Sequence, residues 1–137
     1  MKELTVLAKT DNLDEIIQFV DNELESAECS MKIQMQVQLA VEEIFVNIAN
    51  YAYTPEEGTA TISVDRTEDG ALLRIVFKDN GTPYDPLAKD DPDITLNAKD
   101  RSIGGLGIFI TKKSMDNISY EYKDGQNVLT LEKRIVG

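Results

Sequence analysis

Two pairs of alternating apolar segments, each joined by a tight-turn signal, constrain the fold of this chain more than any other feature. The first pair, TATISVDRT and ALLRIVFKD, is joined at EDG over residues 68–70, and the second pair, in ISYEYKDGQNVLTLEKRI, turns at Asp124-Gly125. Short Asp-Gly connections between such segments are typical of β-hairpins, whose two strands run antiparallel. The chain is therefore predicted to build a largely antiparallel sheet.

Two helical patterns precede the hairpins and follow a short strand-like segment, ELTVLAK at residues 3–9. The first helix is expected to begin with Asp11 or Asn12 as its N-cap, and the second to run from about Ser30 to about Tyr53. The apolar residues of the first helix recur at helical spacing: Leu13, Ile16, Ile17, Val20 and Leu24.

A long segment without any sustained period follows the first hairpin. Residues 80–103 contain three prolines and many small polar residues, and a helix is expected after them from about Leu106 to Met115. A loop of this length inside a compact domain is usually a functional lid or a disordered segment, and we place a lid at about residues 84–103. The order of elements predicts a single α+β domain over residues 1–137. Its expected architecture is a two-layer sandwich with helices on one face of a mixed, mostly antiparallel sheet.

Composition excludes several classes of function. The chain has no histidine, which removes Ser-His-Asp and Cys-His nucleophiles and ordinary zinc sites. Its net charge of -11 argues against nucleic acid and anionic membranes as main partners. Cys29 is the only cysteine, so no internal disulfide is expected. Without a secretory core or an apolar run of roughly 20 residues, the chain is expected to be cytoplasmic.

The second helix carries a polar group opposite its apolar stripe. Glu43, Asn47 and Asn50 share one side, and the ordinary interpretation of such a side is a solvated surface. Apolar neighbours on the same side argue against that interpretation: Leu39, Ala40 and Val46. Glu43 and Asn47, four residues apart, can point into one pocket as a proton acceptor and an oxygen ligand for a hard cation.

A second candidate lies at the end of the first hairpin, in KDNGTPYDP. A type I′ turn at Asn80-Gly81 would need a following strand, which Pro83 and Pro86 disfavour. Asp79 is therefore expected to end a strand with its carboxylate available to an exocyclic amine. Gly81 would let the backbone approach a flat ligand.

The third candidate is RSIGGLGIFITKKSMD, in which Gly104, Gly105 and Gly107 precede helix-forming residues. The segment could simply be a loop that ends in a poorly capped helix. Free backbone N–H groups at a helix N-terminus also form a natural anion site, and phosphate is the anion we expect. Positive charge nearby in the sequence comes from Arg101, Lys112 and Lys113.

In this order the three motifs resemble those of the Bergerat-fold, histidine-kinase-like ATPases. EEIFVN is similar to the helix motif of that family, DNGTP to its adenine-binding box, and GGLGIFI to its glycine box after the lid. The anti-sigma-factor serine/threonine kinases are the most similar subfamily, with DxGxPFDP against DNGTPYDP and GGLGIFL against GGLGIFI. The resemblance spans nearly the whole chain.

The resemblance implies a role for each matching residue. Glu43 matches the general base, Asn47 the Mg²⁺ ligand and Asp79 the carboxylate that reads adenine. Gly81 matches the close-approach glycine of the adenine box, and Arg101 resembles an arginine near the γ-phosphate. The glycine box implies ATP contacts from a further set: Gly104, Gly105, Leu106, Gly107 and Ile108.

Two functions follow from the resemblance. The first is a serine/threonine protein kinase that uses Mg-ATP to phosphorylate an anti-anti-sigma-like partner and regulates transcription in this way. The alternative is a nucleotide-gated binding module that sequesters a sigma factor or another regulator without phosphotransfer. Retention of both Glu43 and Asn47 favours the kinase, because a pure binder needs no positioned base. The resemblance also implies a possible homodimer that pairs through the sheet edge near residues 5–8.

Overall fold

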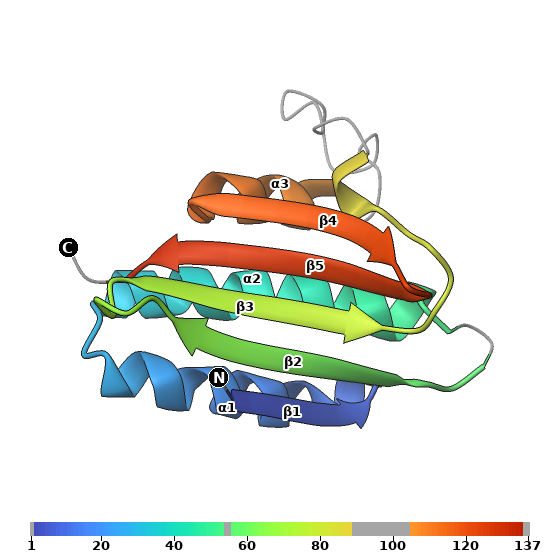
Figure 1. Ribbon diagram of the computed structural model, residues 1–137, viewed down its shortest axis with the longest axis horizontal. Helices are drawn as coiled ribbons and strands as arrows, with labels where there is room; N and C mark the ends of the chain where they lie inside the picture. Colours follow the sequence, from blue (N-terminus) through green and yellow to red (C-terminus); the bar gives the residue numbers. More distant parts are fainter. Residues whose placement is uncertain (1, 54–55, 89–104, 136–137) are drawn as a thin grey trace.

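The computed structural model describes residues 2–53, 56–88 and 105–135 (Figure 1). Their elements follow in the predicted order: β1 Lys2–Leu7, the 3₁₀ turn η1 Thr10–Asn12, α1 Leu13–Ser26, α2 Met31–Tyr51, β2 Thr59–Arg66, β3 Leu72–Asp79, the 3₁₀ turn η2 Pro86–Ala88, α3 Gly105–Ser114, β4 Asn117–Lys123 and β5 Gln126–Arg134. Most of the predicted lid, with Arg101 and also Gly104, lies outside the described residues.

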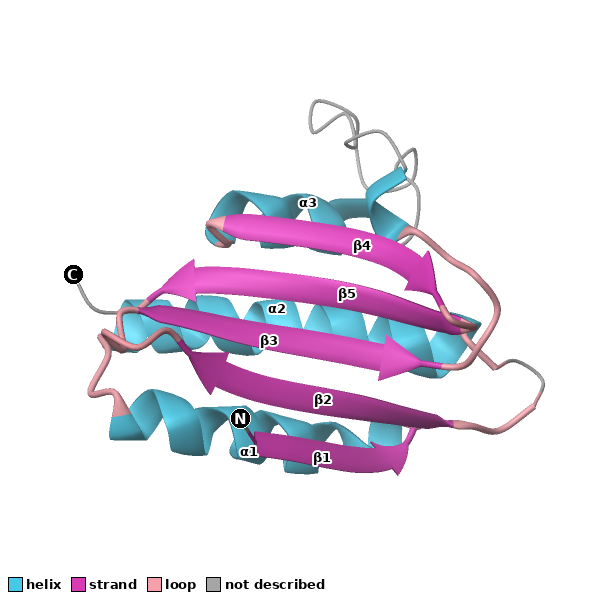
Figure 2. Cartoon of the chain, in the orientation of Figure 1, coloured by secondary structure: helices cyan, strands magenta, loops and turns pink. Residues whose placement is uncertain are grey.

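The five strands form one sheet in the order β1-β2-β3-β5-β4, with α1 and α2 on one face (Figure 2). The predicted α+β sandwich is confirmed. Each of the four pairings between the described strands is antiparallel, so the sheet lacks the parallel component that a mixed sheet would have. β1 lies at one edge, as predicted, whereas pairing with a second copy there stays a prediction.

The core lies between the sheet and the two long helices. Alternate residues of β2 and β3 are buried toward the helices: Ala60, Ile62, Val64, Leu73, Ile75 and Phe77. They meet the buried stripes of α1 and α2: Ile16, Val20, Leu24, Val37, Val41, Ile44 and Phe45. Burying one such aliphatic or aromatic side chain is worth about 1.5–3 kcal/mol, more than any local propensity, and this fixes the faces that the helices present.

Both long helices begin where the sequence predicts, but the N-terminus of α1 lacks the predicted side-chain cap. Ser30 caps α2, because its side chain accepts a hydrogen bond from the Ile33 N–H at 3.2 Å. Asn12 occupies the N-cap position of α1 but makes no side-chain cap. Its amide donates instead to the Leu7 carbonyl at 2.9 Å, so the expected cap is replaced by a tie to the end of β1.

Both predicted hairpins form, and their turns have the expected backbone. Gly70 has φ +74°, and in the second turn Asp124 and Gly125 have φ 54° and 79°. Two consecutive positive φ values are typical of the type I′ turn, whose twist matches that of the flanking strands.

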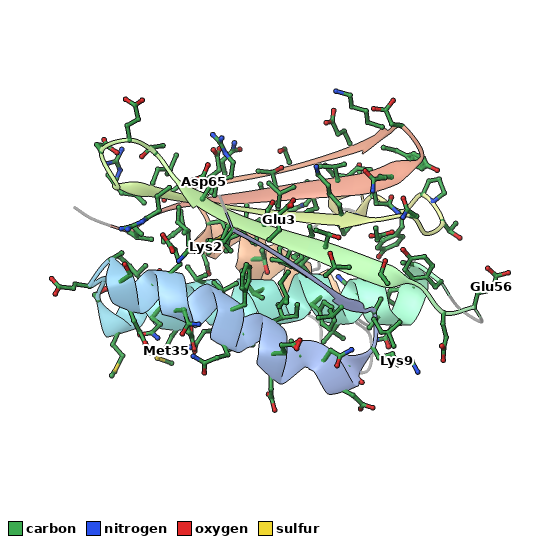
Figure 3. All side chains as sticks on the ribbon, turned by 60° about the horizontal axis from the view of Figure 1, so that its bottom comes forward. Lys2, Glu3, Lys9, Met35, Glu56 and Asp65 are labelled. Atoms are coloured by element: carbon green, nitrogen blue, oxygen red, sulfur yellow. The ribbon has the colours of Figure 1, made fainter. Side chains whose placement is uncertain are left out.

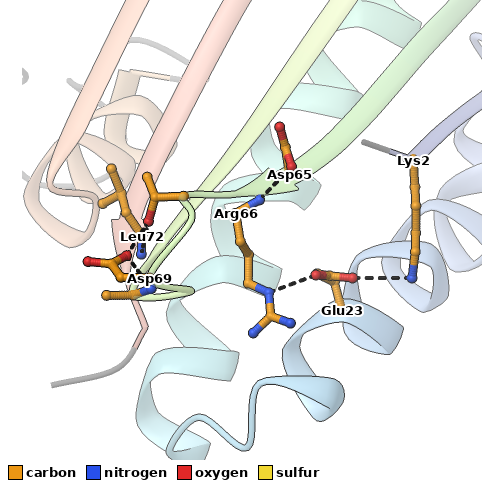
Figure 4. A network of polar contacts seen from close by, with 8 residues as sticks. Lys2, Glu23, Asp65, Arg66, Asp69 and Leu72 are labelled. Atoms are coloured by element: carbon orange, nitrogen blue, oxygen red, sulfur yellow. Dashed lines mark hydrogen bonds and ion pairs between the residues drawn. The ribbon is translucent and has the colours of Figure 1, made fainter.

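An ion-pair network fastens α1 to the sheet beside it (Figure 4). Glu23 of α1 accepts from Arg66 at the end of β2 at 2.8 Å and lies 3.3 Å from the ammonium of Lys2 in β1. In the view of Figure 3 both long helices lie on one side of the sheet, and Met35 of α2 points away from it. Among the helices in the described ranges, none has the length and hydrophobicity required to cross a bilayer.

Candidate functional site

Asp79, at the end of β3, is a buried carboxylate with one oxygen already fixed. Its side chain is 4% exposed. Oδ1 accepts from the Gly81 N–H and from the Asn127 side-chain amide, both at 2.9 Å. In the described part of the chain no residue donates to Oδ2. Asp79 therefore has a fixed orientation and one oxygen available to a donor on a ligand.

Asn127, near the start of β5, organises this carboxylate, and the sequence analysis missed it. Its amide nitrogen donates to Asp79 and to the Thr82 carbonyl at 3.0 Å. Its oxygen accepts from the Tyr84 N–H at 3.1 Å and from the Tyr120 hydroxyl. The sequence did offer a sign of this role. Alternate residues of a strand face the same side, so Asn127 lies on the core-facing side with the apolar residues at 129 and 131.

The turn after Asp79 packs against the C-terminal end of α2. The Thr82 N–H donates to the Ala52 carbonyl at 2.8 Å, and a Cβ on Gly81 would lie 2.3 Å from the same oxygen. Tyr53 strengthens this junction, since its hydroxyl accepts from the Asn80 N–H at 2.8 Å and donates to a backbone carbonyl of β2 at 2.6 Å. Glycine at position 81 is thus explained by contact with α2, and its approach to a ligand stays a prediction.

A shallow hollow adjoins Asp79 between α2 and the sheet, and it measures about 400 Å³ only when open solvent is included. Its walls are mainly apolar, including Ile44, Phe77 and Leu129, and Asn47 and Asn127 also line it. Tyr84 stands in the wall with its ring 5.7 Å from that of Tyr51. Ligand pockets usually combine apolar walls with a few oriented polar groups, so the chemistry of this lining suits a flat ring that carries an amine.

Glu43 and Asn47 lie together on α2, as predicted, and they touch. The Asn47 amide nitrogen donates to Glu43 Oε1 at 3.4 Å. Within the described residues nothing donates to Asn47 Oδ1, which leaves this oxygen available as a ligand for a cation. Burial raises the pKa of Glu43, the hydrogen bond from Asn47 opposes the rise, and the charge of Glu42 adds to it.

Glu43 faces a second hollow, which runs between α2 and α3 and measures about 650 Å³ including open solvent. Leu39 and Ile110 border it and are 54% and 44% exposed. Glu42 also lines this hollow, but its side chain is exposed, whereas Glu43 is half-buried. The pair of Glu43 and Asn47 therefore stands between the two hollows.

The glycine segment forms the first turn of α3, which begins at Gly105 and includes Leu106. Gly107 lies against the carboxylate of Glu43, and Ile108 is buried in the core. Lys112 and Lys113 are in the last turn, roughly 11 Å along the helix from its start. The charge of these two lysines, which the sequence placed near an anion site, thus lies at the opposite end of α3, and Arg101 is outside the described residues.

The described residues offer no ready-made metal centre of three or more acidic, histidine or cysteine side chains. Mg²⁺ is usually held by one or two protein oxygens together with substrate phosphates and waters. A free Asn47 Oδ1 beside the Asp79 hollow fits such a cation.

The chain is an α+β domain in which Glu43 and Asn47 of α2 and the carboxylate of Asp79 at a strand end line neighbouring hollows. The histidine kinase-like ATPase domain family matches residues 6–133, and the chain belongs to this family.

Its curated relatives are named as protein kinases. The serine/threonine-protein kinase BtrW of Bordetella bronchiseptica is 31% identical over 103 residues, which are 74% of this chain and 71% of that protein. The serine-protein kinase RsbW of Listeria monocytogenes is 31% identical over 98 residues, or 68% of this chain and 61% of the relative. The chain thus spans about three fifths of the length of that RsbW protein. These names agree with the predicted class of enzyme.

Solved structures confirm the fold. A histidine kinase domain from Erythrobacter litoralis EL346 superposes with a TM-score of 0.55 at 14% identity, over 75% of this chain and 45% of that one. The Acinetobacter baumannii histidine kinase AdeS gives a TM-score of 0.55 at 12% identity, over 100% of this chain and 70% of that one.

Proposed function

We propose that this protein is a serine/threonine protein kinase that transfers the γ-phosphate of Mg-ATP to a partner regulatory protein. The observation that carries the proposal is the contact between Glu43 and Asn47 at the boundary of the two hollows. A nucleotide in the hollow beside Asp79 would reach Asn47 with its phosphates, and a hydroxyl in the other hollow would reach Glu43.

On the nucleotide side, Asp79 Oδ2 accepts a hydrogen bond from the exocyclic amine of adenine. Asn47 would hold Mg²⁺ through Oδ1, and the phosphates would supply further ligands to the cation. When bound there, the cation would neutralise charge on the phosphate oxygens. Positioning and electrostatics carry most of the catalysis in phosphoryl transfer, so fixed orientations matter more here than covalent chemistry on the protein.

On the acceptor side, Glu43 is the base. It takes the proton of a serine or threonine hydroxyl while the hydroxyl oxygen bonds to the γ-phosphorus, and the bond from that phosphorus to the leaving ADP oxygen breaks. A carboxylate whose pKa is raised by burial is a stronger base than an exposed one. General-base catalysis of this kind contributes about 10²–10⁴ in rate.

The acceptor is proposed to be an anti-anti-sigma-like protein, with a sigma factor as a further partner. The exposed apolar side chains of Leu39 and Ile110 suit contact with a protein surface. This surface would serve a binding module equally well, so it does not separate the two functions. A half-buried carboxylate that has a raised pKa and faces an accessible hollow is the arrangement expected of a general base, and this favours the kinase.

Incubation with Mg-ATP and candidate antagonist proteins, followed by mass measurement, tests the proposal. A gain of one phosphate on a serine or threonine of the partner is the expected result. Stable, ATP-dependent binding of the same partner without phosphate gain would instead establish the binding module.

A further inference from the structure

We propose that Gly107 is a positioning residue for Glu43: without a side chain it lets α3 hold the Glu43 carboxylate against the helix backbone. The inference rests on the proposed function, because it concerns the base of that reaction. It differs from the phosphate contact that the resemblance implies for this glycine. Gly107 is the third residue of α3, where glycine is less favourable than alanine, so a local reason for its presence is needed.

The reason is a close contact across two helices. A Cβ built on Gly107 would lie 2.2 Å from Cδ and Oε2 of Glu43 and 2.5 Å from Oε1. These separations are well inside van der Waals contact, so no other residue fits while the carboxylate stays where it is. Gly107 and Glu43 also line the same hollow between α2 and α3.

The helix backbone on the Gly107 side is firmly held. Thr111, one turn further along α3, is 2% exposed, so this part of the helix is packed against the rest of the fold, and its hydroxyl donates to the Gly107 carbonyl within the helix at 2.9 Å. The next residue, Ile108, is buried in the core. On the opposite side, the Asn47 amide donates to the Glu43 carboxylate. The carboxylate is therefore confined between an amide of α2 and the backbone of α3.

A methyl group at position 107 would displace the carboxylate, because the end of a flexible side chain yields more readily than an anchored helix. Displacing a reacting group by about 1 Å can cost about 10²-fold in rate. The same contact couples α3 to the base, since any shift of the first turns of α3 moves the wall against which Glu43 rests.

The test is a double-variant cycle with Gly107→Ala in three backgrounds: unchanged, Glu43→Asp and Glu43→Ala. Aspartate is one methylene shorter and leaves room for the new methyl. Where the contact is relieved, Gly107→Ala should raise Tm by about 3–5 °C through helix propensity, and in the unchanged background it should give no such gain. Lys113→Ala, an exposed change in the last turn of α3, is the control and should shift Tm equally in all three.

Transfer to the acceptor found by mass measurement gives the second readout. Gly107→Ala is expected to lower the rate constant at saturating Mg-ATP by about 10- to 100-fold, and by less than about 3-fold in the Glu43→Asp background. An equal gain in Tm in all three backgrounds would overturn the contact. The positioning role would be overturned if Gly107→Ala weakened ATP binding instead of slowing transfer. It would also be overturned if the rate fell equally in the unchanged and Glu43→Asp proteins. If the unchanged protein transfers no phosphate, the proposed function fails and the base-positioning role fails with it, while the melting temperatures still decide the contact.

Discussion

Replacing Asn127 with alanine should damage both the fold and the nucleotide site. The side chain is 6% exposed and makes four hydrogen bonds, two as donor and two as acceptor. The bond to the Asp79 carboxylate is worth roughly 1.5–3 kcal/mol, and each partner left buried without a bond costs about 1–3 kcal/mol. Because some of these groups can reach water after relaxation, we expect a total loss of about 3–5 kcal/mol.

Urea unfolding gives the stability, and calorimetry with Mg-ATP gives the affinity, which should fall at least about 10-fold as Asp79 loses its orientation. Asn127→Asp should weaken ATP binding further, since it removes the donor and adds a second negative charge beside Asp79. The matched control is Asn117→Ala, which removes an exposed asparagine whose side chain donates to Glu132 at 2.9 Å, far from Asp79 in the sheet register. A stability loss below about 0.5 kcal/mol for Asn127→Ala, with ATP affinity unchanged, would refute this account of Asn127.

Three other predictions concern Asp79, Gly81 and Glu132. Asp79→Asn should reduce ATP affinity about 10- to 150-fold by calorimetry, because an amide is a weaker acceptor and adds a competing donor. Gly81→Ala should lower the free energy of unfolding in urea by about 1–3 kcal/mol, because its methyl would lie 2.3 Å from a backbone oxygen at the end of α2. Hydrogen bonds from Asn117 and Arg74 lower the pKa of Glu132, so its stabilisation is present at neutral pH and is lost as pH falls through the lowered value. Glu132→Gln should therefore lower Tm at pH 7, and the difference should shrink below about pH 4.

Local patterns in the sequence were enough to predict most of the fold. The hairpin turns, the start of α2 at Ser30 and the strand end at Asp79 each depend on residues close together in the chain. The apolar stripe of α2 was predicted for the same reason. The predicted side-chain cap of α1 was wrong because the Asn12 side chain bonds the Leu7 carbonyl at the end of β1 instead of the backbone of α1.

The candidate site was predictable only in part. Glu43 and Asn47 are four residues apart on one helix, so helical geometry brings them together. Asn127 reaches Asp79 across neighbouring strands, and Gly107 reaches Glu43 across two helices. Such contacts depend on strand order and helix packing, neither of which a single sequence fixes. The sequence therefore did not predict that Asn127 would contact Asp79 or that Gly107 would contact Glu43.

Single-turnover phosphoryl transfer by Glu43→Gln, measured beside Glu42→Gln and together with the ATP affinity of both variants, tests the central claim most directly. Both changes remove one negative charge from neighbouring residues of α2, but only Glu43 is half-buried and bonded to Asn47. Glu43→Gln is predicted to slow transfer by about 10²–10⁴ with ATP affinity nearly intact, whereas Glu42→Gln should leave both nearly unchanged. Transfer that survives Glu43→Gln, or that is lost with Glu42→Gln instead, would contradict the assignment of Glu43 as the base.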